Sequence, residues 1–204
     1  MMDWLEASYP QAQRILGIDE AGRGPLAGPC VVAGVILPKG YVHPLINDSK
    51  KLSEKQRERC FKDIVLDALW IGVISVLPET IDQRNIYQAT RDANIHLIAL
   101  ANADLCLTDA MPVSGQKIPV YDFIKGDSRS ISIASASIIA KVCRDAMMRD
   151  YDLQYPEYGF KQHKGYPTKA HIEALRTYGI TPIHRKSYAP VAAVMKPNLF
   201  GGES

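Results

Sequence analysis

Cysteine is scarce in this chain of 204 residues, and its four cysteines share no spacing typical of a metal or redox site. Cys30 and Cys106 lie in apolar runs typical of strands, whereas Cys60 and Cys143 fall within helical patterns. Free cysteine is among the most buried residue types, so we expect four buried, reduced thiols. Reduced thiols fit the cytoplasm, where we expect this protein to reside.

Long apolar runs are also absent, and neither sign of charge dominates. No run reaches the roughly 18 apolar residues that a membrane span requires, and the first residues lack the basic and apolar regions of a signal peptide. We therefore expect neither a membrane partner nor export. The net charge is only +2, but the stretch 141–188 holds nine Lys or Arg against five Asp or Glu. That local excess is equally typical of a solvated face and of a contact with a polyanion.

At 204 residues and 47% apolar, the chain suits one domain with its own core. Runs of apolar, often β-branched residues predict strands at 14–19, 30–37, 70–77, 105–108 and 120–124. Apolar periodicity predicts helices at 53–69, 85–102, 132–150 and 168–178. Ser53 and Gln56 form a capping box that opens the first of these helices. Strands run together first and then alternate with helices, which predicts an α/β fold with a mixed sheet covered by helices.

Two adjacent carboxylates, Asp19 and Glu20, close the first predicted strand and stand before a glycine-bracketed arginine. Charge in such a place is costly to bury unless something pairs with it. Asp109 ends another strand, where ligands gather in open α/β sheets, and Asp145 lies on a predicted helix. Four converging acids would suit two divalent ions about 3.5–4 Å apart and metal-assisted chemistry on phosphate. For any single acid, a helix cap, an ion pair or a solvated charge remains the alternative.

Other motifs point to no rival chemistry. The pattern Gly-x-Gly-x-x-Ala at 22–27 matches a relaxed dinucleotide fingerprint, but that fingerprint needs a helix next, and a predicted strand follows here. The chain has no His-Glu-x-x-His motif and no Gly-x-Ser-x-Gly elbow, which argues against zinc and serine hydrolases. Three histidines of the C-terminal part lack cysteine partners for zinc: His163, His171 and His184.

Taken in order, several stretches over residues 14–191 resemble the ribonuclease HII family. They are Gly17–Pro25, Asn47–Leu52, Lys125–Ser128, Ala134–Asp145, Tyr158–Thr168 and His184–Tyr188. The resemblance implies a ribonuclease H-like fold: a mixed five-stranded sheet flanked by helices, with a small helical C-terminal extension. We therefore expect one catalytic domain over 1–204, with a core at 14–150 and a basic, aromatic, substrate-contacting part at 151–204.

The activity that the resemblance implies is endonucleolytic cleavage of the RNA strand of RNA–DNA hybrids. It extends to cleavage 5′ of single ribonucleotides embedded in duplex DNA, as in ribonucleotide excision repair. The implied cofactor is Mn²⁺ or Mg²⁺, and the implied partners are the hybrid and the ribonucleotide-containing duplex. A monomer is expected from the family.

Carried onto this chain, the family's four acids fall on Asp19, Glu20, Asp109 and Asp145. The first three are the expected metal ligands. One departure concerns the third acid, since the family usually has Asp-Gly where this chain has Asp109-Ala110. Asp104 is the other candidate for that position, but Asp109 fits the end of the strand better.

The family's substrate-binding residues are carried over in the same way. The loop that senses the 2′-hydroxyl falls on Gly22, Arg23 and Gly24, and the tyrosine that packs against the sugar falls on Tyr166. Ser49 and Lys50, with Lys51, precede a helix start, which is a natural place for a phosphate. The alternatives are an arginine that only pairs with an acid, a core tyrosine and a solvated basic loop.

Three rival functions are weaker. A ribonuclease HIII normally carries an N-terminal substrate-binding domain, and too few residues precede the first predicted strand for one. A non-catalytic hybrid-binding module would gain nothing from clustered acids, which repel phosphate unless metals neutralise them. A phosphotransferase would need a Walker-type Gly-Lys-Ser/Thr, which Lys125–Ser128 is not.

Overall fold

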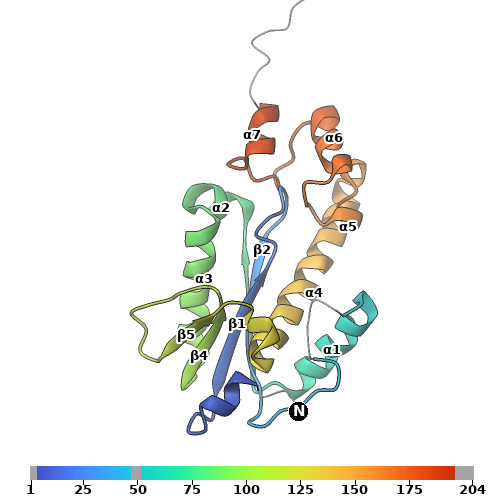
Figure 1. The fold of residues 1–204 in the computed structure, drawn as a ribbon. Helices are drawn as coiled ribbons and strands as arrows, with labels where there is room; N and C mark the ends of the chain where they lie inside the picture. The colour runs from blue at the N-terminus through green and yellow to red at the C-terminus, as the bar shows by residue number, and fades with distance from the viewer. Residues whose placement is uncertain (1–3, 47–51, 196–204) are drawn as a thin grey trace, which may run out of the picture.

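The computed structural model describes residues 4–46 and 52–195, and its centre is a five-stranded sheet (Figure 1). The strands are β1 (Ile15–Ala21), β2 (Cys30–Ile36), β3 (Trp70–Val76), β4 (Leu105–Asp109) and β5 (Val120–Phe123). Their order across the sheet is β3-β2-β1-β4-β5. The pairs β1–β2 and β2–β3 are antiparallel, whereas β1–β4 and β4–β5 are parallel. The predicted mixed five-stranded sheet is therefore confirmed.

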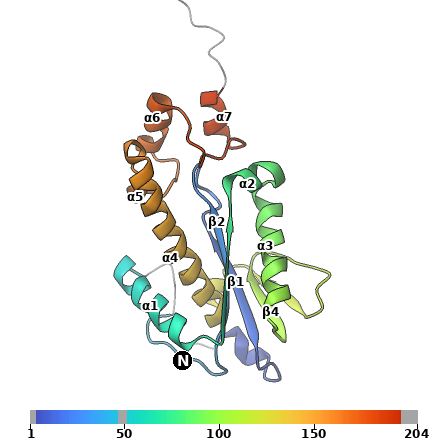
Figure 2. The same cartoon turned by 180° about the vertical axis from the view of Figure 1, so that it is seen from behind.

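Helices cover both faces of this sheet, as the view from behind also shows (Figure 2). On one face lie α1 (Glu54–Asp67) and the long α4 (Ile131–Gln154), and on the other lie α2 (Pro78–Arg84) and α3 (Ile86–Leu100). The C-terminal part adds α5 (Phe160–His163), α6 (Lys169–Tyr178) and α7 (Ala189–Met195). Three short 3-10 helices complete the described elements: η1 (Leu5–Ser8), η3 (Gly126–Ser128) and η4 (Pro156–Tyr158).

The core forms two layers because side chains of a strand alternate between the faces of a sheet. In β2, Val31, Ala33 and Val35 pack toward α1 and α4, whereas Val32 and Ile36 pack toward α3. Strands buried on both faces read as continuous apolar runs, which is why β2 was recognisable from the sequence.

Gly17 sets the distance between β1 and α4. A Cβ atom at this position would lie 2.2 Å from the carbonyl carbon of Ser132 and 2.3 Å from the amide nitrogen of Ile133. Any larger residue would push the start of α4 away from the sheet. The strand and the helix that carry the acids of interest are thus held in direct backbone contact.

The predicted elements agree with the observed ones apart from their ends. The capping box of Ser53 and Gln56 is present, and α4 runs four residues beyond its predicted end at Asp150. The first strand continues past Asp19, because Asp19, Glu20 and Ala21 still pair with β2. The short helices α2, α5 and α7 were not predicted.

All four cysteines are free, as expected. Three of them are buried, while Cys143 is only half-buried, so the expectation of four buried thiols is wrong for this one. None of the helices in residues 4–46 and 52–195 is both long and apolar enough to cross a lipid bilayer.

Candidate active site

Three of the predicted acids meet at the end of the central parallel pair of strands. β1 and β4 pair Ile18 with Thr108, so the next residues, Asp19 and Asp109, lie side by side. Glu20 follows directly, and its backbone N–H donates to Asp19 Oδ1 over 2.7 Å. Acids that are ninety residues apart in the chain are thus brought together by strand register.

Burial and mutual repulsion both act on this acid cluster. The pKa of Asp19 is raised well above its usual range, first because it is buried and then because Glu20 and Asp109 are negative neighbours. A hydrogen bond from Ser137 partly offsets this rise. Burial also raises the pKa of Glu20, and the Asp109 charge adds to that rise, while the Arg23 guanidinium 3.3 Å away opposes it. A positive charge placed among these carboxylates would therefore lower their pKa and stabilise their ionised forms.

Backbone contacts hold Asp109 in place. The Gly126 N–H donates to Asp109 Oδ1 over 2.7 Å, which ties the end of β4 to η3. The rival acid, Asp104, lies elsewhere: it is exposed and accepts the N–H groups of Gln13 and Arg14 at 2.7 and 2.9 Å. The preference for Asp109 over Asp104 agrees with this geometry.

Asp145 is placed differently from the other three acids. Its Oδ1 accepts from Lys141 Nζ over 2.7 Å in an ion pair on α4. It follows Ser137, the residue that bonds Asp19, by two helical turns, or about 12 Å along the helix axis. Asp145 thus pairs with a lysine on its own helix and not with the acid cluster.

Asp127 is an acid to which the sequence pattern assigned no role. It lies in η3, next to the glycine that binds Asp109, and only 2% of it is exposed. The signal that could have found it was already visible, since it belongs to the stretch Lys125–Ser128 that carries part of the family resemblance. Because it is buried next to the glycine that binds Asp109, Asp127 is a candidate member of the acid cluster.

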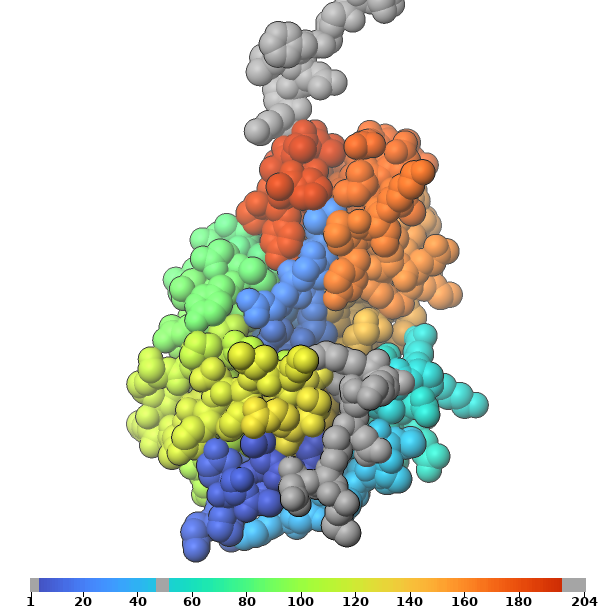
Figure 3. Space-filling view, viewed as in Figure 1, coloured from blue at the N-terminus to red at the C-terminus, as the bar shows by residue number. Residues whose placement is uncertain are grey.

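The loop that follows β1 is held from beneath by a fully buried arginine, Arg185. Its guanidinium donates to the carbonyl oxygens of Gly22, Arg23 and Gly28 at 2.6 to 3.1 Å. The Tyr188 hydroxyl donates to the same Arg23 carbonyl over 2.6 Å. In the space-filling view this connection between β1 and β2 reaches the surface between α7 and the α5–α6 region (Figure 3).

A second buried arginine, Arg144 of α4, supports the loop from its other side. It donates to the carbonyl oxygens of Pro29 and Lys164 at 2.9 Å and of Ala27 at 3.3 Å. Burial and the nearby charge of Arg185 lower the pKa of Arg144 to about 10. Both guanidinium groups are thus satisfied by backbone carbonyls instead of carboxylates, so their charge is left to act on the site.

Gly22 has to be glycine for two reasons. Its φ of 99° lies in the left-handed region, and a Cβ atom there would lie 2.0 Å from Arg144 Nε. The loop and the arginine can occupy their positions only because this side chain is missing.

A cavity of about 430 Å³ is lined by one acid of the cluster, Glu20, and by the loop that follows β1. Its lining includes Glu20, the segment 22–24, Ser137, Lys141 and Tyr166. Tyr166 is 44% exposed, and its ring edge lies 3.6 Å from where a Gly24 Cβ atom would be. The structure therefore brings the predicted tyrosine, the predicted loop and the acid Glu20 to one cavity.

Two residues that line this cavity, Arg57 and Lys141, were not predicted as site residues from the sequence. Arg57 of α1 lines the same cavity and donates to the Leu52 carbonyl over 2.9 Å. Lys141 also lines it, one turn after Ser137. The predicted phosphate contacts Ser49 and Lys50, with Lys51, lie outside the described residues.

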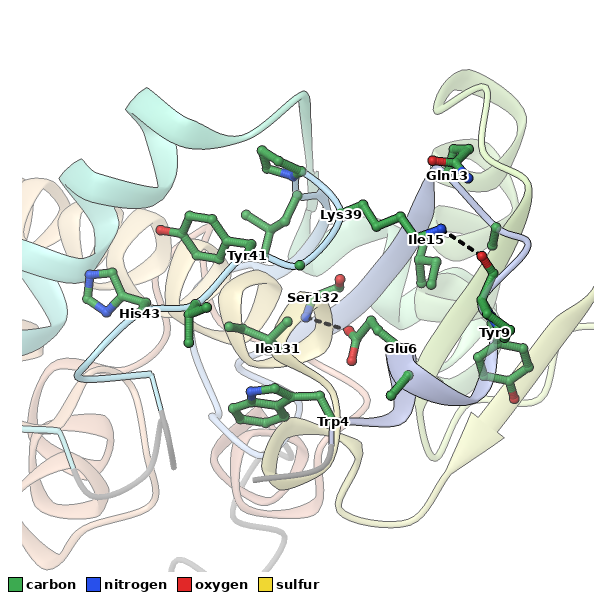
Figure 4. Close-up of a pocket in the computed structure, with 17 residues that line it drawn as sticks. Trp4, Glu6, Tyr9, Gln13, Ile15, Lys39, Tyr41, His43, Ile131 and Ser132 are labelled. Atoms are coloured by element: carbon green, nitrogen blue, oxygen red, sulfur yellow. Dashed lines mark hydrogen bonds between the residues drawn. The ribbon is translucent and has the colours of Figure 1, made fainter. Parts of the chain in front are cut away.

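A larger cavity of about 700 Å³ lies at the opposite end of the sheet, between the N-terminal segment and the residues after β2 (Figure 4). Two of its polar side chains, Glu6 and Lys39, form hydrogen bonds to other segments of the protein. Glu6 accepts from the Ser132 N–H at the start of α4, and Lys39 Nζ donates to the Pro10 carbonyl over 2.6 Å. None of the predicted site residues lines it.

Comparisons with known proteins agree with this geometry. The family model described as ribonuclease HII matches residues 16–191. A ribonuclease HII from Acholeplasma laidlawii is 55% identical over 184 residues, which cover 89% of this chain and 90% of that protein. The chain belongs to the ribonuclease HII family.

Solved structures support the same assignment. The ribonuclease H2 from Pyrococcus horikoshii superimposes with a TM-score of 0.77 at 25% identity, over 89% of this chain and 96% of that one. A Bst ribonuclease HIII, solved in complex with Mn²⁺, has the same fold with a TM-score of 0.66 at 18% identity, over 93% of this chain and 71% of that one. This ribonuclease HII is thus a metal-dependent hydrolase that acts on RNA–DNA hybrids.

The acid cluster of this ribonuclease HII has the donor chemistry that a hard divalent cation prefers. Carboxylate oxygens suit Mg²⁺ and Mn²⁺, and a bound cation would offset the repulsion that raises the pKa of Asp19 and Glu20. Within residues 4–46 and 52–195, no three His, Cys, Asp or Glu side chains are grouped closely enough to hold an ion as they stand.

Proposed function

We propose that this ribonuclease HII cleaves 5′ of single ribonucleotides embedded in duplex DNA, as well as within RNA–DNA hybrids, by two-metal-ion hydrolysis. In this reaction water attacks the phosphorus, the bond to the 3′ oxygen of the preceding nucleotide breaks, and 3′-hydroxyl and 5′-phosphate ends remain. The observation that carries the proposal is the shared cavity, in which Glu20 of the acid cluster, the loop at 22–24 and Tyr166 face one another.

Asp19, Glu20 and Asp109 are the proposed metal ligands. Their convergence on one strand end and the raised pKa of two of them support this role. Bound Mn²⁺ or Mg²⁺ would activate the attacking water and stabilise the departing oxygen. The chain's own part is to hold two of these carboxylates in place, Asp19 through Ser137 and Asp109 through the Gly126 amide, so that they would be available to bind a divalent ion.

Two residues compete for the fourth acidic position. Asp145 remains a candidate for the second ion or for placing the water, but its ion pair with Lys141 keeps it engaged along α4. Asp127 is the stronger candidate, because it directly follows Gly126, whose N–H binds Asp109 of the acid cluster. Burial does not separate the two, since Asp127 is 2% and Asp145 7% exposed. Lys141, which lines the cavity, then gains a partner in Asp145 that fixes its position.

The loop at 22–24 supports recognition of a 2′-hydroxyl. Arg185 takes up the carbonyl oxygens of Gly22 and Arg23. In a trans peptide the N–H points opposite to the carbonyl, so the N–H groups of Arg23 and Gly24 point away from the buried arginine. Two backbone donors on the cavity side suit a ribose hydroxyl oxygen, and reading that hydroxyl is how a protein tells RNA from DNA.

Tyr166 is the proposed contact to the sugar next to the ribonucleotide. Its ring is half-exposed on the cavity and stands beside Gly24, so a core role does not account for it. The guanidinium of Arg144, 5.9 Å from the ring centroid, supports the ring from beneath. Ser49 and Lys50 are proposed as contacts to the phosphate backbone because, with Lys51, they precede a helix start.

Incubation with a DNA duplex that contains one ribonucleotide tests this function. The expected result is a single nick on the 5′ side of the ribonucleotide, present with Mn²⁺ or Mg²⁺ and absent with a chelator. The all-DNA duplex of the same sequence should stay intact. Cleavage of long hybrids without any nick at a single ribonucleotide would reject the finer substrate assignment.

A further inference from the structure

Two histidines of the C-terminal part form a buried pair behind the cavity. His171 belongs to α6 and His184 to the segment that follows it, and they are 0% and 1% exposed. Their Nε2 atoms lie 3.1 Å apart, which is a hydrogen-bond distance between two rings. Neither residue lines the cavity, so substrate contact does not explain them.

The neighbours of the pair fix where each proton sits. The Thr181 backbone N–H donates to His184 Nδ1 over 2.9 Å, so this nitrogen is an acceptor and the proton of His184 is on Nε2. That proton points at Nε2 of His171, which must therefore accept. The proton of His171 is left on Nδ1, from which it donates to the Tyr166 carbonyl over 3.0 Å.

The result is a chain of hydrogen bonds with a single direction, from the Thr181 amide through both rings to the carbonyl of Tyr166. An extra proton on either ring would set two N–H groups face to face, so the chain requires both rings to be neutral. Burial lowers the pKa of each histidine to about 4, with a further contribution from the charge of His163 for His171 and from that of His171 for His184. Both are thus neutral donors and acceptors at neutral pH.

The surroundings are aromatic and hold the two rings rigidly. Rings of Tyr158 and Phe160 pack against both histidines at centroid distances of 5.2 to 6.5 Å. His163 stacks on His171 at 4.5 Å, and it accepts the Gly165 N–H and bonds the Tyr158 carbonyl. Because the rings cannot reorient without disturbing this packing, the bond to Tyr166 is fixed in direction.

The carbonyl that receives this bond belongs to Tyr166 itself and precedes Pro167. The Tyr166 N–H donates to the His163 carbonyl over 2.9 Å, and the Tyr166 carbonyl also accepts the Thr168 N–H over 2.8 Å. The ring stands half-exposed on the cavity beside Gly24. The buried pair therefore holds the backbone carbonyl of Tyr166 inside the protein, while the Tyr166 ring faces the cavity.

We propose that His171 is a positioning residue for Tyr166: its Nδ1–H holds the Tyr166 carbonyl so that the ring meets the sugar at the cleavage junction, and His184 fixes the tautomer that places the proton on Nδ1. This inference rests on the proposed role of Tyr166. A merely structural role would stabilise the C-terminal part without any coupling to the ring. The two roles differ in what happens when the ring is already absent.

A pair of variants separates the two bonds of His171. In His171→Asn the side-chain amide can still reach the Tyr166 carbonyl, in the place of Nδ1, but loses the bond to His184. In His171→Gln the longer side chain can still reach His184 but no longer offers a donor to the carbonyl. Circular dichroism and thermal unfolding show whether each variant is folded, and the two serve as controls for one another.

The test combines each variant with Tyr166→Ala, using a duplex with one ribonucleotide. We expect His171→Gln to lower kcat/KM about tenfold and His171→Asn about twofold or less, both relative to the wild type. In the Tyr166→Ala background, His171→Gln should have no further effect, because the positioned ring is gone. An equal loss in both backgrounds would mean independent contributions and would overturn the proposal.

Hydrogen–deuterium exchange of the free protein gives a readout that does not depend on activity. We expect the amides at 164–168 to exchange about tenfold faster in His171→Gln than in the wild type or His171→Asn. Unchanged exchange in His171→Gln overturns the positioning role. If the wild type fails to nick the duplex while the exchange result holds, the proposed function fails and the positioning of the Tyr166 backbone stands.

Discussion

Individual carboxylates in this protein differ in role because they differ in surroundings. Asp19 is buried among negative neighbours, Asp109 is held by a backbone amide, and Asp145 is paired with a lysine. An isolated Asp is ambiguous in a sequence, since a cap, an ion pair and a metal ligand all use the same side chain. The role of each carboxylate depends on the groups that contact it, and for Asp19 and Asp109 these come from distant segments of the chain.

The fourth acid can be assigned by comparing two variants, Asp127→Asn and Asp145→Asn. We expect Asp127→Asn to lower kcat by about 100-fold or more, as loss of a metal-site carboxylate would. Asp145→Asn should cost less than about 10-fold, since it breaks the ion pair with Lys141 but leaves the acid cluster unchanged. Steady-state cleavage rates at saturating Mn²⁺ measure both, and the reverse order would return the fourth position to Asp145.

Ala110 carries a backbone conformation that suits glycine, with a φ of 49°. A left-handed conformation costs a non-glycine residue roughly 1–2 kcal/mol. We therefore expect Ala110→Gly to raise the free energy of unfolding by about 1 kcal/mol and Tm by about 2–4 °C. Because the backbone already has this conformation, kcat should not change. A lower Tm, as for glycine in an ordinary position, would show that the residue is not strained.

At the scale of elements, β1 and its following loop carry most of the site, and much of this could be predicted. The paired acids, the glycines and the strand were all visible in one stretch, Gly17–Gly24. The supports of the loop were not. Arg144 and Arg185 belong to the basic excess and to stretches that match the family, but no structural role was predicted for them, because a sequence does not show which arginines will be buried against backbone carbonyls.

Gly22→Ala tests whether the loop and Arg144 depend on each other. The added Cβ would collide with Arg144 Nε, at 2.0 Å, and the residue would also be strained at its φ of 99°. We expect Tm to fall by several degrees and the preference for ribonucleotide over deoxyribonucleotide sites to drop about tenfold or more. Binding of both duplexes and nick mapping measure this preference.

Gly40→Ala is the matched control for that substitution. Gly40 has a φ of 76°, but nothing lies within 4 Å of its would-be Cβ atom. This variant should therefore show the backbone strain alone, about 1–2 kcal/mol, with unchanged selectivity. Equal effects of the two substitutions on selectivity would argue against a special role of the Gly22–Arg144 contact.

At the scale of the whole molecule, the C-terminal part completes the site instead of merely extending the domain. Arg185, Tyr188 and Tyr166 all reach the loop after β1. The sequence indicated a basic, aromatic segment here, but not the buried pair of His171 and His184. Histidines carry no periodic signal, and their bonds depend on how α6 and the segment after it fold back together.

This histidine pair makes stability depend on pH. The pKa of both histidines is about 4 in the folded protein, against about 6.5 in an unfolded chain. The unfolded state therefore takes up protons first, so stability is lost as pH falls from about 6.5 toward 4. We expect His171→Asn to lose about 1 kcal/mol less than the wild type between pH 7 and pH 5. Urea unfolding at several pH values checks this, and parallel curves would contradict it.

The acid cluster itself is tested most directly by Asp19→Asn. Its side chain keeps its shape but loses the charge that the cation needs, so cleavage of a single-ribonucleotide duplex should fall by at least about 1,000-fold. Affinity for an uncleaved hybrid should change less than about threefold, because the loop, Tyr166 and the buried arginines remain. Cleavage at the wild-type rate in the Asp19→Asn variant would contradict the account.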